Sequence, residues 1–323
     1  MTHLAPEVRS TILCVFAALG VASAFSIALQ RMKPERDFAE LRSRIRTWWM
    51  IVGLFSASLF WSPKAAIAFL GFVSFLALKE FLSMTPTRRA DRRVLFYAYL
   101  AVIIQYWFAG SGSYGMFIMF IPVLMFVWLP TRMLIIGHTD GFLRAAGTLH
   151  WGLMISVFSL SHAAYLLMMQ TGELPRIAPA YPSDVGTQFP GPGLLMFLIL
   201  ATELNDIFQY IWGKTLGKRK VAPLVSPGKT YAGLIGGVLS TIVFAALIGP
   251  SITLFDVQHS IIAGTIIGIA GFAGDLCMSA LKRDLKIKDF GATLPGHGGV
   301  LDRVDSLVFT APLFFHFVYY CYG

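Results

Sequence analysis

Residues 231–250 read YAGLIGGVLSTIVFAALIGP, twenty consecutive residues without a charged side chain. A helix of about 20 apolar residues is long enough to cross the hydrocarbon core of a bilayer. In lipid, only helices and closed barrels satisfy every backbone hydrogen bond, and a run of this length is helical. The segment therefore predicts a membrane-spanning helix.

The composition of the whole chain agrees with this segment. Of its 323 residues, 56% are hydrophobic and only 13% are charged, whereas soluble domains carry about 25% charged residues. The three cysteines form no CxxC pair, which argues against disulfides and zinc. We expect an all-α, polytopic transmembrane bundle of about ten helices, near 11–30, 47–62, 65–84, 94–109, 114–129, 150–169, 193–212, 231–250, 259–281 and 306–321.

The positive charges predict the orientation of this bundle. With the N-terminus outside, only Arg9, Lys64 and Arg176 of the 26 lysines and arginines lie away from the cytoplasm, as the positive-inside rule requires. Topology and lipid headgroups then explain most of the net charge of +9, so we expect no nucleic acid partner. The predicted cytoplasmic connections are 31–46, 85–93, 130–149, 213–230 and 282–305, and the Pro- and Gly-rich segment 170–192 is predicted to be an external loop.

Polar side chains interrupt the apolar run at 193–212. Asp206, Gln209 and Tyr210 are spaced by three and four residues, so they share one helix face. A charge at the bilayer centre costs about 2.5–3.5 kcal/mol on insertion scales. These residues therefore face a cavity or a partner, unless the helix end already lies among the headgroups.

The basic loop 213–230 ends in the sequence SPGKT. Ser226 followed by Pro227 predicts a helix start, and a helix N-terminus beside Lys229 is a natural phosphate site. The GKT ending does not make a P-loop, because Pro223 stands where that motif needs glycine and no βα unit precedes it. An ordinary basic loop would explain the lysines of 214–220 but not SPGKT.

The strongest signal is the segment 274–305, GDLCMSALKRDLKIKDFGATLPGHGGVLDRVD. If the preceding helix continues, Asp275, Ser279, Lys282 and Lys286 fall on one face. A glycine-rich turn follows at 295–299.

Two more carboxylates, Asp302 and Asp305, are expected to open the last helix on a single face. Carboxylates at two helix ends can converge on one divalent cation, and Mg²⁺ favours one or two carboxylates plus substrate phosphates. The neighbouring lysines and arginines suit phosphate oxygens.

These residues resemble the phosphatidate cytidylyltransferase family, the CDP-diacylglycerol synthases. The family's SPxKT motif is matched at 226–230, and the resemblance is clear from about 200 to 323. It divides the chain into N-terminal helices at 1–192, lipid-facing or an oligomer scaffold, and a catalytic transmembrane region at 193–323 with loops 213–230 and 282–305. Every fixed position of the family's second signature is present: Ser279, Lys282, Arg283, Lys288, Asp289, Pro295, His297, Gly298, Gly299, Asp302, Arg303 and Asp305.

The resemblance implies that CTP and phosphatidate react to give CDP-diacylglycerol and pyrophosphate. A lipid phosphate monoester has a second pKa of about 6, so it is largely dianionic at neutral pH and needs no strong base to attack. It needs charge neutralisation instead, because both reactants are anionic. The resemblance implies Mg²⁺ as cofactor, with a second cation such as K⁺. We also expect a homodimer in a bacterial inner membrane, with the active site facing the cytoplasm.

The expected roles follow the charges of the side chains. Asp275 and Asp302 are expected to bind the metal as catalytic residues, with Asp305 close to them. The triphosphate and the departing pyrophosphate are assigned to Lys282, Arg283, Lys288 and Arg303, and either phosphate to Lys229. Asp289 and His297 orient these groups or contact cytosine. The other expected substrate contacts are Ser226, Thr230, Ser279, Asp206 and Tyr210.

One departure from the family pattern concerns the acceptor lipid. The family has small residues before its Ala-Tyr pair, where this chain has Ile207, Phe208 and Gln209. The bulkier side chains should alter the lipid groove, and a related transferase acting on a prenyl or ether lipid phosphate remains an alternative. A transporter also places carboxylates near helix breaks. However, the first six helices carry almost no polar residues except Lys79 and Glu80.

Overall fold

The computed structural model describes residues 4–33, 37–85, 88, 92–135, 137, 139–169 and 190–322, and these are almost entirely helical. Two π-helical segments, η2 (Phe120–Met125) and η3 (Met154–Phe158), join α5 to α6 and α7 to α8. The helices are α1 (Pro6–Met32), α2 (Ala39–Trp61), α3 (Pro63–Met84), α4 (Arg92–Ser111), α5 (Tyr114–Met119), α6 (Phe126–Ile135), α7 (Phe142–Leu153), α8 (Ser159–Leu166), α9 (Gly191–Thr215), α10 (Tyr231–Ile252), α11 (Val257–Asp284) and α12 (Leu307–Tyr322).

The ten predicted runs correspond to ten continuous helices in the described part of the chain, so the all-α bundle is confirmed. Seven of these helices are long and apolar enough to cross a membrane, and α12 is a shorter apolar helix. The π-helical segment η2 contains Pro122, which has no N–H to donate to the α-helical ladder. The predicted external loop at 170–192 lies mostly outside the described residues, at 170–189.

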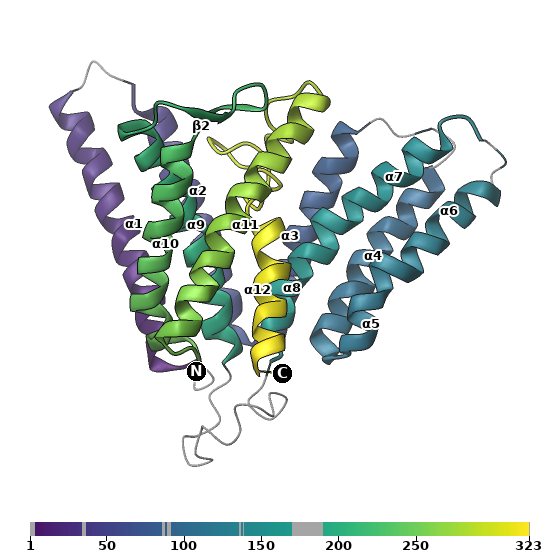
Figure 1. The fold of residues 1–323 in the computed structure, drawn as a ribbon, viewed down its shortest axis with the longest axis horizontal. Helices are drawn as coiled ribbons and strands as arrows, with labels where there is room; N and C mark the ends of the chain where they lie inside the picture. Colours follow the sequence, from purple (N-terminus) through teal and green to yellow (C-terminus); the bar gives the residue numbers. More distant parts are fainter. Residues whose placement is uncertain are drawn as a thin grey trace, which may run out of the picture.

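The helices run between two ends of the molecule and spread like a fan (Figure 1). Both chain termini lie at the lower end in this view. The helix ends that flank the five predicted cytoplasmic connections lie at or towards the upper end, except that α12 begins deeper in the bundle. The segment between α11 and α12 therefore descends from the upper end into the bundle.

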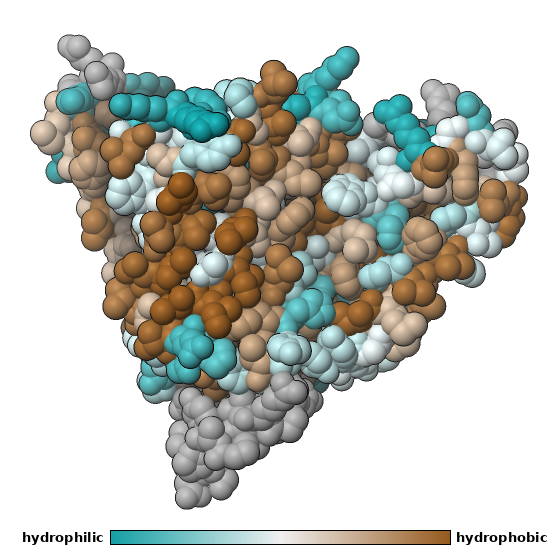
Figure 2. Space-filling model, in the orientation of Figure 1, coloured by the Kyte–Doolittle hydropathy of each residue, from teal (hydrophilic) through white to brown (hydrophobic). Residues whose placement is uncertain are grey.

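The outer surface has the distribution of a protein embedded in lipid. Figure 2 shows hydrophilic residues along the upper edge and hydrophobic residues over α10 and α11 below it. On α10, an outward stripe at a spacing of four residues is more than half exposed: Ile235, Leu239, Val243 and Leu247. Large exposed apolar patches mark contact with a partner or a membrane, and with seven long apolar helices the chain is an integral membrane protein.

The basic loop contains a hairpin, not the predicted helix start. Strand β2 (Ser226–Thr230) pairs antiparallel with β1 (Lys220–Ala222). The prediction that Ser226 caps a helix is therefore wrong. Thr230 is the cap instead, because its Oγ1 accepts a hydrogen bond from Gly233 N at 3.0 Å and α10 begins at the next residue.

Helix α11 carries Asp275, Ser279 and Lys282 as predicted, but it ends before Lys286. Lys286 has a φ of 56°, and its N–H donates to Arg283 O, while the N–H of the next residue donates to Lys282 O. This pattern is a Schellman termination, in which one residue adopts the left-handed conformation. Lys286 therefore does not extend the helix face.

The expectation that Asp302 and Asp305 open the last helix is also wrong. Helix α12 begins at Leu307, and both carboxylates lie in the turns before it. The cause is hydrogen bonding, because Asp302 accepts N–H groups from its own loop and so holds the chain in a compact turn.

Candidate functional site

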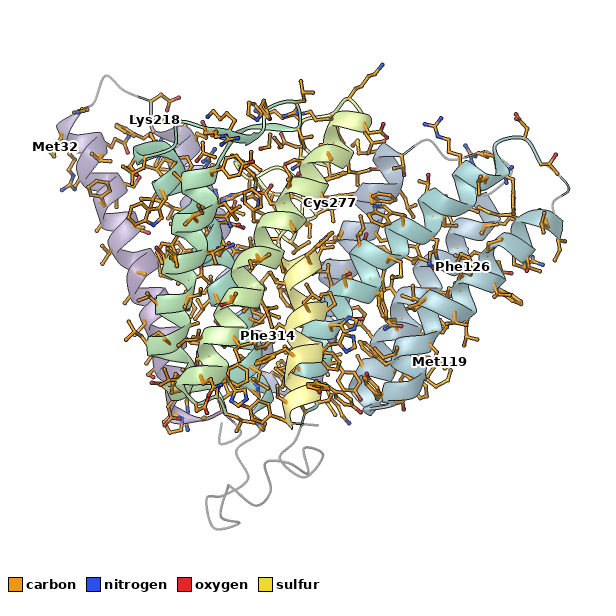
Figure 3. The ribbon with its side chains drawn as sticks, in the orientation of Figure 1. Met32, Met119, Phe126, Lys218, Cys277 and Phe314 are labelled. Atoms are coloured by element: carbon orange, nitrogen blue, oxygen red, sulfur yellow. The ribbon has the colours of Figure 1, made fainter. Side chains whose placement is uncertain are left out.

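A cavity of about 610 Å³ lies between α9, α10, α11 and the hairpin. It contains members of all three polar stretches identified in the sequence. Figure 3 shows the level of this region, with Lys218, which lies between α9 and β1, at the upper edge and Cys277 of α11 below it. The predicted site residues that line the cavity are Asp206, Tyr210, Ser226, Lys229, Thr230 and Asp275.

An ion pair forms one wall of this cavity. Lys229 Nζ lies 2.6 Å from Asp275 Oδ2, with side chains 12% and 30% exposed. The ammonium also lies 4.5 Å from the centre of the Phe272 ring, and Ser279 Oγ donates to Asp275 Oδ1 at 3.3 Å. The lysine predicted to bind phosphate and the carboxylate predicted to bind metal are thus direct neighbours.

The polar face of α9 lines the same cavity. Asp206 Oδ2 accepts a hydrogen bond from Ser306 Oγ at 2.8 Å. Asp206 Oδ1 and Gln209 Nε2 are buried and have no hydrogen-bond partner within the described part of the chain. Gln209 fits against α10 because Gly237 has no side chain to meet it. Two residues that line the cavity therefore each carry a buried polar atom with unused hydrogen-bonding capacity.

Asp302 has different surroundings from Asp275. Its side chain is 1% exposed, and its Oδ1 accepts from Lys282 Nζ at 2.9 Å. Its Oδ2 accepts from Phe290 N at 2.8 Å and from Gly299 N at 3.0 Å. Its charge is thus already neutralised by Lys282, and a metal ion at Asp302 would have to share Oδ1 with that ammonium. In this arrangement Asp302 connects the end of α11 to the following loop.

Of the two carboxylates predicted to bind Mg²⁺, one lies at the cavity and the other does not. Asp275 lines the cavity, whereas Asp302 is not among the lining residues. The described residues contain no group of three or more His, Cys, Asp or Glu side chains that could hold a metal by themselves. Mg²⁺ is commonly held by one or two carboxylates plus substrate phosphates. Of the two predicted ligands, Asp275 therefore fits this cofactor better than Asp302, and Mg²⁺ stays a prediction.

Asp305 lies near enough to Asp275 for the two carboxylates to repel each other. It lies between α11 and α12, and its Oδ1 accepts from Ser306 N at 2.9 Å. Burial, and then repulsion by Asp275, raise the pKa of the Asp305 carboxyl, which Lys282 opposes. Carboxylates this close to one another need nearby cations when they are all ionised.

The other predicted residues lie around the loop between α11 and α12, away from the cavity wall. Arg283 Nε donates to Val225 O in the hairpin at 3.2 Å. The ring of His297 meets the Trp48 ring edge-on, with 6.0 Å between the centres. Burial, followed by the charge of Arg303, lowers the pKa of His297, so the imidazole is neutral at pH 7. Four members of the set are exposed: Arg283, Lys288, Asp289 and Arg303.

The sequence reasoning did not identify two N-terminal residues that contact this loop. Thr47 Oγ1 of α2 donates to Pro295 O at 2.8 Å, and the Glu80 carboxylate of α3 accepts three hydrogen bonds from residues 293–301. A glutamate within an apolar run was the one available signal.

Fold and site together define a polytopic membrane protein with a charged cavity at one end of its bundle. A model of the cytidylyltransferase family matches residues 42–321. The chain belongs to that family, and the resemblance seen in the sequence is confirmed.

The relatives fall into two groups. An uncharacterized protein of Escherichia coli K12, YnbB, is 42% identical over 308 residues, which cover 95% of this chain and 97% of YnbB. A phosphatidate cytidylyltransferase of Staphylococcus haemolyticus is 36% identical over 162 residues, covering 48% of this chain and 59% of that protein. One of Aquifex aeolicus is 41% identical over 121 residues, covering 38% and 45%. The chain thus spans about half the length of the phosphatidate cytidylyltransferases that it matches.

Proposed function

We propose that this protein is a membrane phosphatidate cytidylyltransferase. It would transfer CMP from CTP to phosphatidate, giving CDP-diacylglycerol and pyrophosphate. The observation that carries the proposal is the Lys229–Asp275 pair, which lines a polar cavity at one end of a lipid-facing bundle. The family membership and the names of the two bacterial relatives support it.

The chemistry needs charge neutralisation above all. An oxygen of the lipid phosphate attacks the α-phosphorus of CTP, and the bond from that phosphorus to the β-phosphate bridging oxygen breaks. Both reactants are anionic, so cations must hold the attacking and leaving oxygens together. Within the cavity, Lys229, Lys214 and Lys220 are the lysines that can meet phosphate oxygens.

The proposed cofactor is Mg²⁺, with a second cation such as K⁺. Bound Mg²⁺ would neutralise charge on the phosphate oxygens, and Asp275 is the residue that would hold it. Lys229 orients Asp275 and offers its own ammonium to the phosphate. Ser279 fixes the other oxygen of Asp275.

The position of the cavity agrees with one lipid substrate and one soluble substrate. The outer face of α10 is apolar, so acyl chains can remain in the bilayer beside it. The loops at the charged end face the cytoplasm in the predicted orientation, from which CTP would arrive. We place the protein in a bacterial inner membrane as a homodimer.

A second acceptor is favoured by one observation. Gln209 lines the cavity where the family has a small residue, and its amide nitrogen has no partner in the described structure. A lipid phosphate with an additional hydrogen-bond acceptor in its headgroup would satisfy it. The related lipid phosphates are therefore tested alongside phosphatidate.

The test uses the purified full-length protein in detergent with Mg²⁺. Label from α-³²P-CTP should enter lipid when phosphatidate is offered, with one pyrophosphate released for each CDP-lipid formed. Prenyl and ether lipid phosphates are offered in parallel to determine the acceptor. Absence of labelled lipid with every acceptor would refute the cytidylyltransferase proposal.

A further inference from the structure

Glu80 is a buried carboxylate from the N-terminal half, and within the described part of the chain its side-chain hydrogen bonds all come from the loop between α11 and α12. It lies on α3 and is 6% exposed. Its Oε1 accepts from Thr293 Oγ1 at 2.6 Å and from Val300 N at 2.9 Å. Its Oε2 accepts from Leu301 N at 2.9 Å. Residues more than 200 positions apart in the sequence are thus joined through one side chain.

The ion pairs of the described residues do not include Glu80. A buried charge is costly unless it is paired or hydrogen-bonded. Here the compensation comes from three donors, two of them backbone N–H groups, and hydrogen bonds to an ionised carboxylate are among the strong ones in proteins. The carboxylate therefore depends on the conformation of the loop, and the loop depends on the carboxylate.

Two glycines make room for the Glu80 carboxylate. A Cβ atom at Gly299 would lie 2.5 Å from Glu80 Oε2, and one at Gly291 would lie 2.8 Å from Oε1. Real Cβ atoms do not approach other atoms so closely. The loop is thus shaped around Glu80 on two sides.

The same loop segment also holds Asp302. Gly299 N donates to Asp302 Oδ2, and the next two N–H groups along the chain donate to Glu80. Three successive N–H groups are therefore divided between two buried carboxylates. Asp302 in turn accepts from Lys282 at the end of α11. Displacing Glu80 would release two of these N–H groups and loosen the support of the Asp302–Lys282 pair.

We propose that Glu80 is a positioning residue for nucleotidyl transfer. It fixes the loop at 290–301, and through Asp302 it sets the position of Lys282. This inference rests on the proposed function, since the loop is argued to serve that reaction. It gives the N-terminal helices a part in the site beyond that of a lipid-facing scaffold.

The decisive variant is Glu80→Gln, which keeps the shape of the side chain. In either orientation its NH₂ group faces a backbone N–H, at Val300 or at Leu301. We expect kcat to fall about 10- to 100-fold, the factor that corresponds to one or two lost hydrogen bonds to a charged group. KM for the lipid should stay nearly constant, because the cavity walls belong to α9, α10 and α11.

A matched control separates positioning from plain structural support. Gln105 of α4 is also fully buried and donates to Phe117 O and Ser161 Oγ, away from the loop. Gln105→Leu should lower Tm as Glu80→Gln does, but leave kcat unchanged. Thr293→Val removes one donor to Glu80, so combining it with Glu80→Gln should cost less activity than the two single effects predict.

Hydrogen exchange tests the contact independently of turnover. The amides of Val300 and Leu301 should be protected in the wild-type protein and exchange faster in Glu80→Gln. If the wild-type protein forms no CDP-lipid, the proposed function fails, while the exchange still shows whether Glu80 holds the loop. A Glu80→Gln variant with wild-type kcat, or with unchanged exchange at both amides, would overturn the positioning role.

Discussion

Two regions of this molecule use carboxylates in opposite ways. At the cavity, Asp275 is 30% exposed and pairs with Lys229. At the loop between α11 and α12, Asp302 of the loop and Glu80 of α3 are buried, and each accepts three hydrogen bonds. The cavity pair can exchange partners with an incoming anion or cation, whereas the loop carboxylates are already satisfied. Residue type alone does not distinguish a reacting group from a supporting one.

The largest expected effect concerns the cavity pair. Lys229→Met should lower turnover by about 10²–10³-fold, because it removes a cation from the phosphates in the transition state. The effect on Tm should be small, since Lys229 and Asp275 are both in contact with the cavity. Turnover of α-³²P-CTP into lipid measures the first quantity, and thermal unfolding in detergent measures the second.

The control for this variant is Glu40→Gln, which removes an exposed ion pair with Arg44 on α2. Exposed pairs contribute about 0–1 kcal/mol, so neither turnover nor Tm should change much. Equal turnover in Lys229→Met and Glu40→Gln would contradict the claim that the cavity residues act in the reaction whereas the loop residues support the structure. It would also remove the main support for the cavity as the reaction site.

The second-largest effect is expected at Asp302, in the loop between α11 and α12. Asp302→Asn should lower turnover and also destabilise the fold, because breaking a buried pair from one side costs about 3–5 kcal/mol. The asparagine NH₂ would face either Lys282 or the N–H groups of Phe290 and Gly299. Asp275→Asn should lower turnover without a comparable loss in Tm. Similar unfolding temperatures for the two variants would contradict the assignment of Asp302 to loop support.

Much of the bundle could be predicted because hydrophobicity is a local property. Each of the ten apolar runs became a helix, and the segment 274–305 identified the family. The same reasoning placed Asp206, Lys229 and Asp275 together before any contact was visible, and they line one cavity.

The failures share a physical cause, which is that hydrogen bonds to residues outside each short motif decided the conformation of that motif. Ser226–Thr230 has a helix-start signature, yet pairing with 220–222 makes it a strand. Asp302 looked like the first turn of a helix, yet the N–H groups of Phe290 and Gly299 hold it in a turn. Glu80 could not be linked to the loop, because no spacing rule connects residues 80 and 300.

A third prediction tests how tightly the loop is fitted. Gly299→Ala would place a Cβ 2.5 Å from Glu80 Oε2 and 2.9 Å from Gly291 N. Overpacking of this kind costs about 1–3 kcal/mol, so Tm should fall. Gly115→Ala is the matched control, because no atom lies within 4 Å of the added Cβ. A Gly299→Ala variant as stable as Gly115→Ala would show that the loop can move away from Glu80 at little cost.

The smallest effect concerns His297, the polar side chain in the loop that is not fully satisfied. Its Nδ1 is buried and has no partner among the described atoms, and the charges that face it are Arg303 and Arg44. Burial, then Arg303, lower its pKa, so the folded protein resists protonation of the ring more than the unfolded chain does. The folded state therefore binds fewer protons, and stability should fall as the pH drops below the unfolded value of about 6.5 towards the folded one. His297→Gln should show a smaller fall in Tm between pH 7 and pH 5 than the wild type. An identical pH dependence in His297→Gln and the wild type would mean that the loop accommodates the imidazolium, and that its polar groups are less rigidly fixed than the hydrogen bonds of Glu80 and Asp302 indicate.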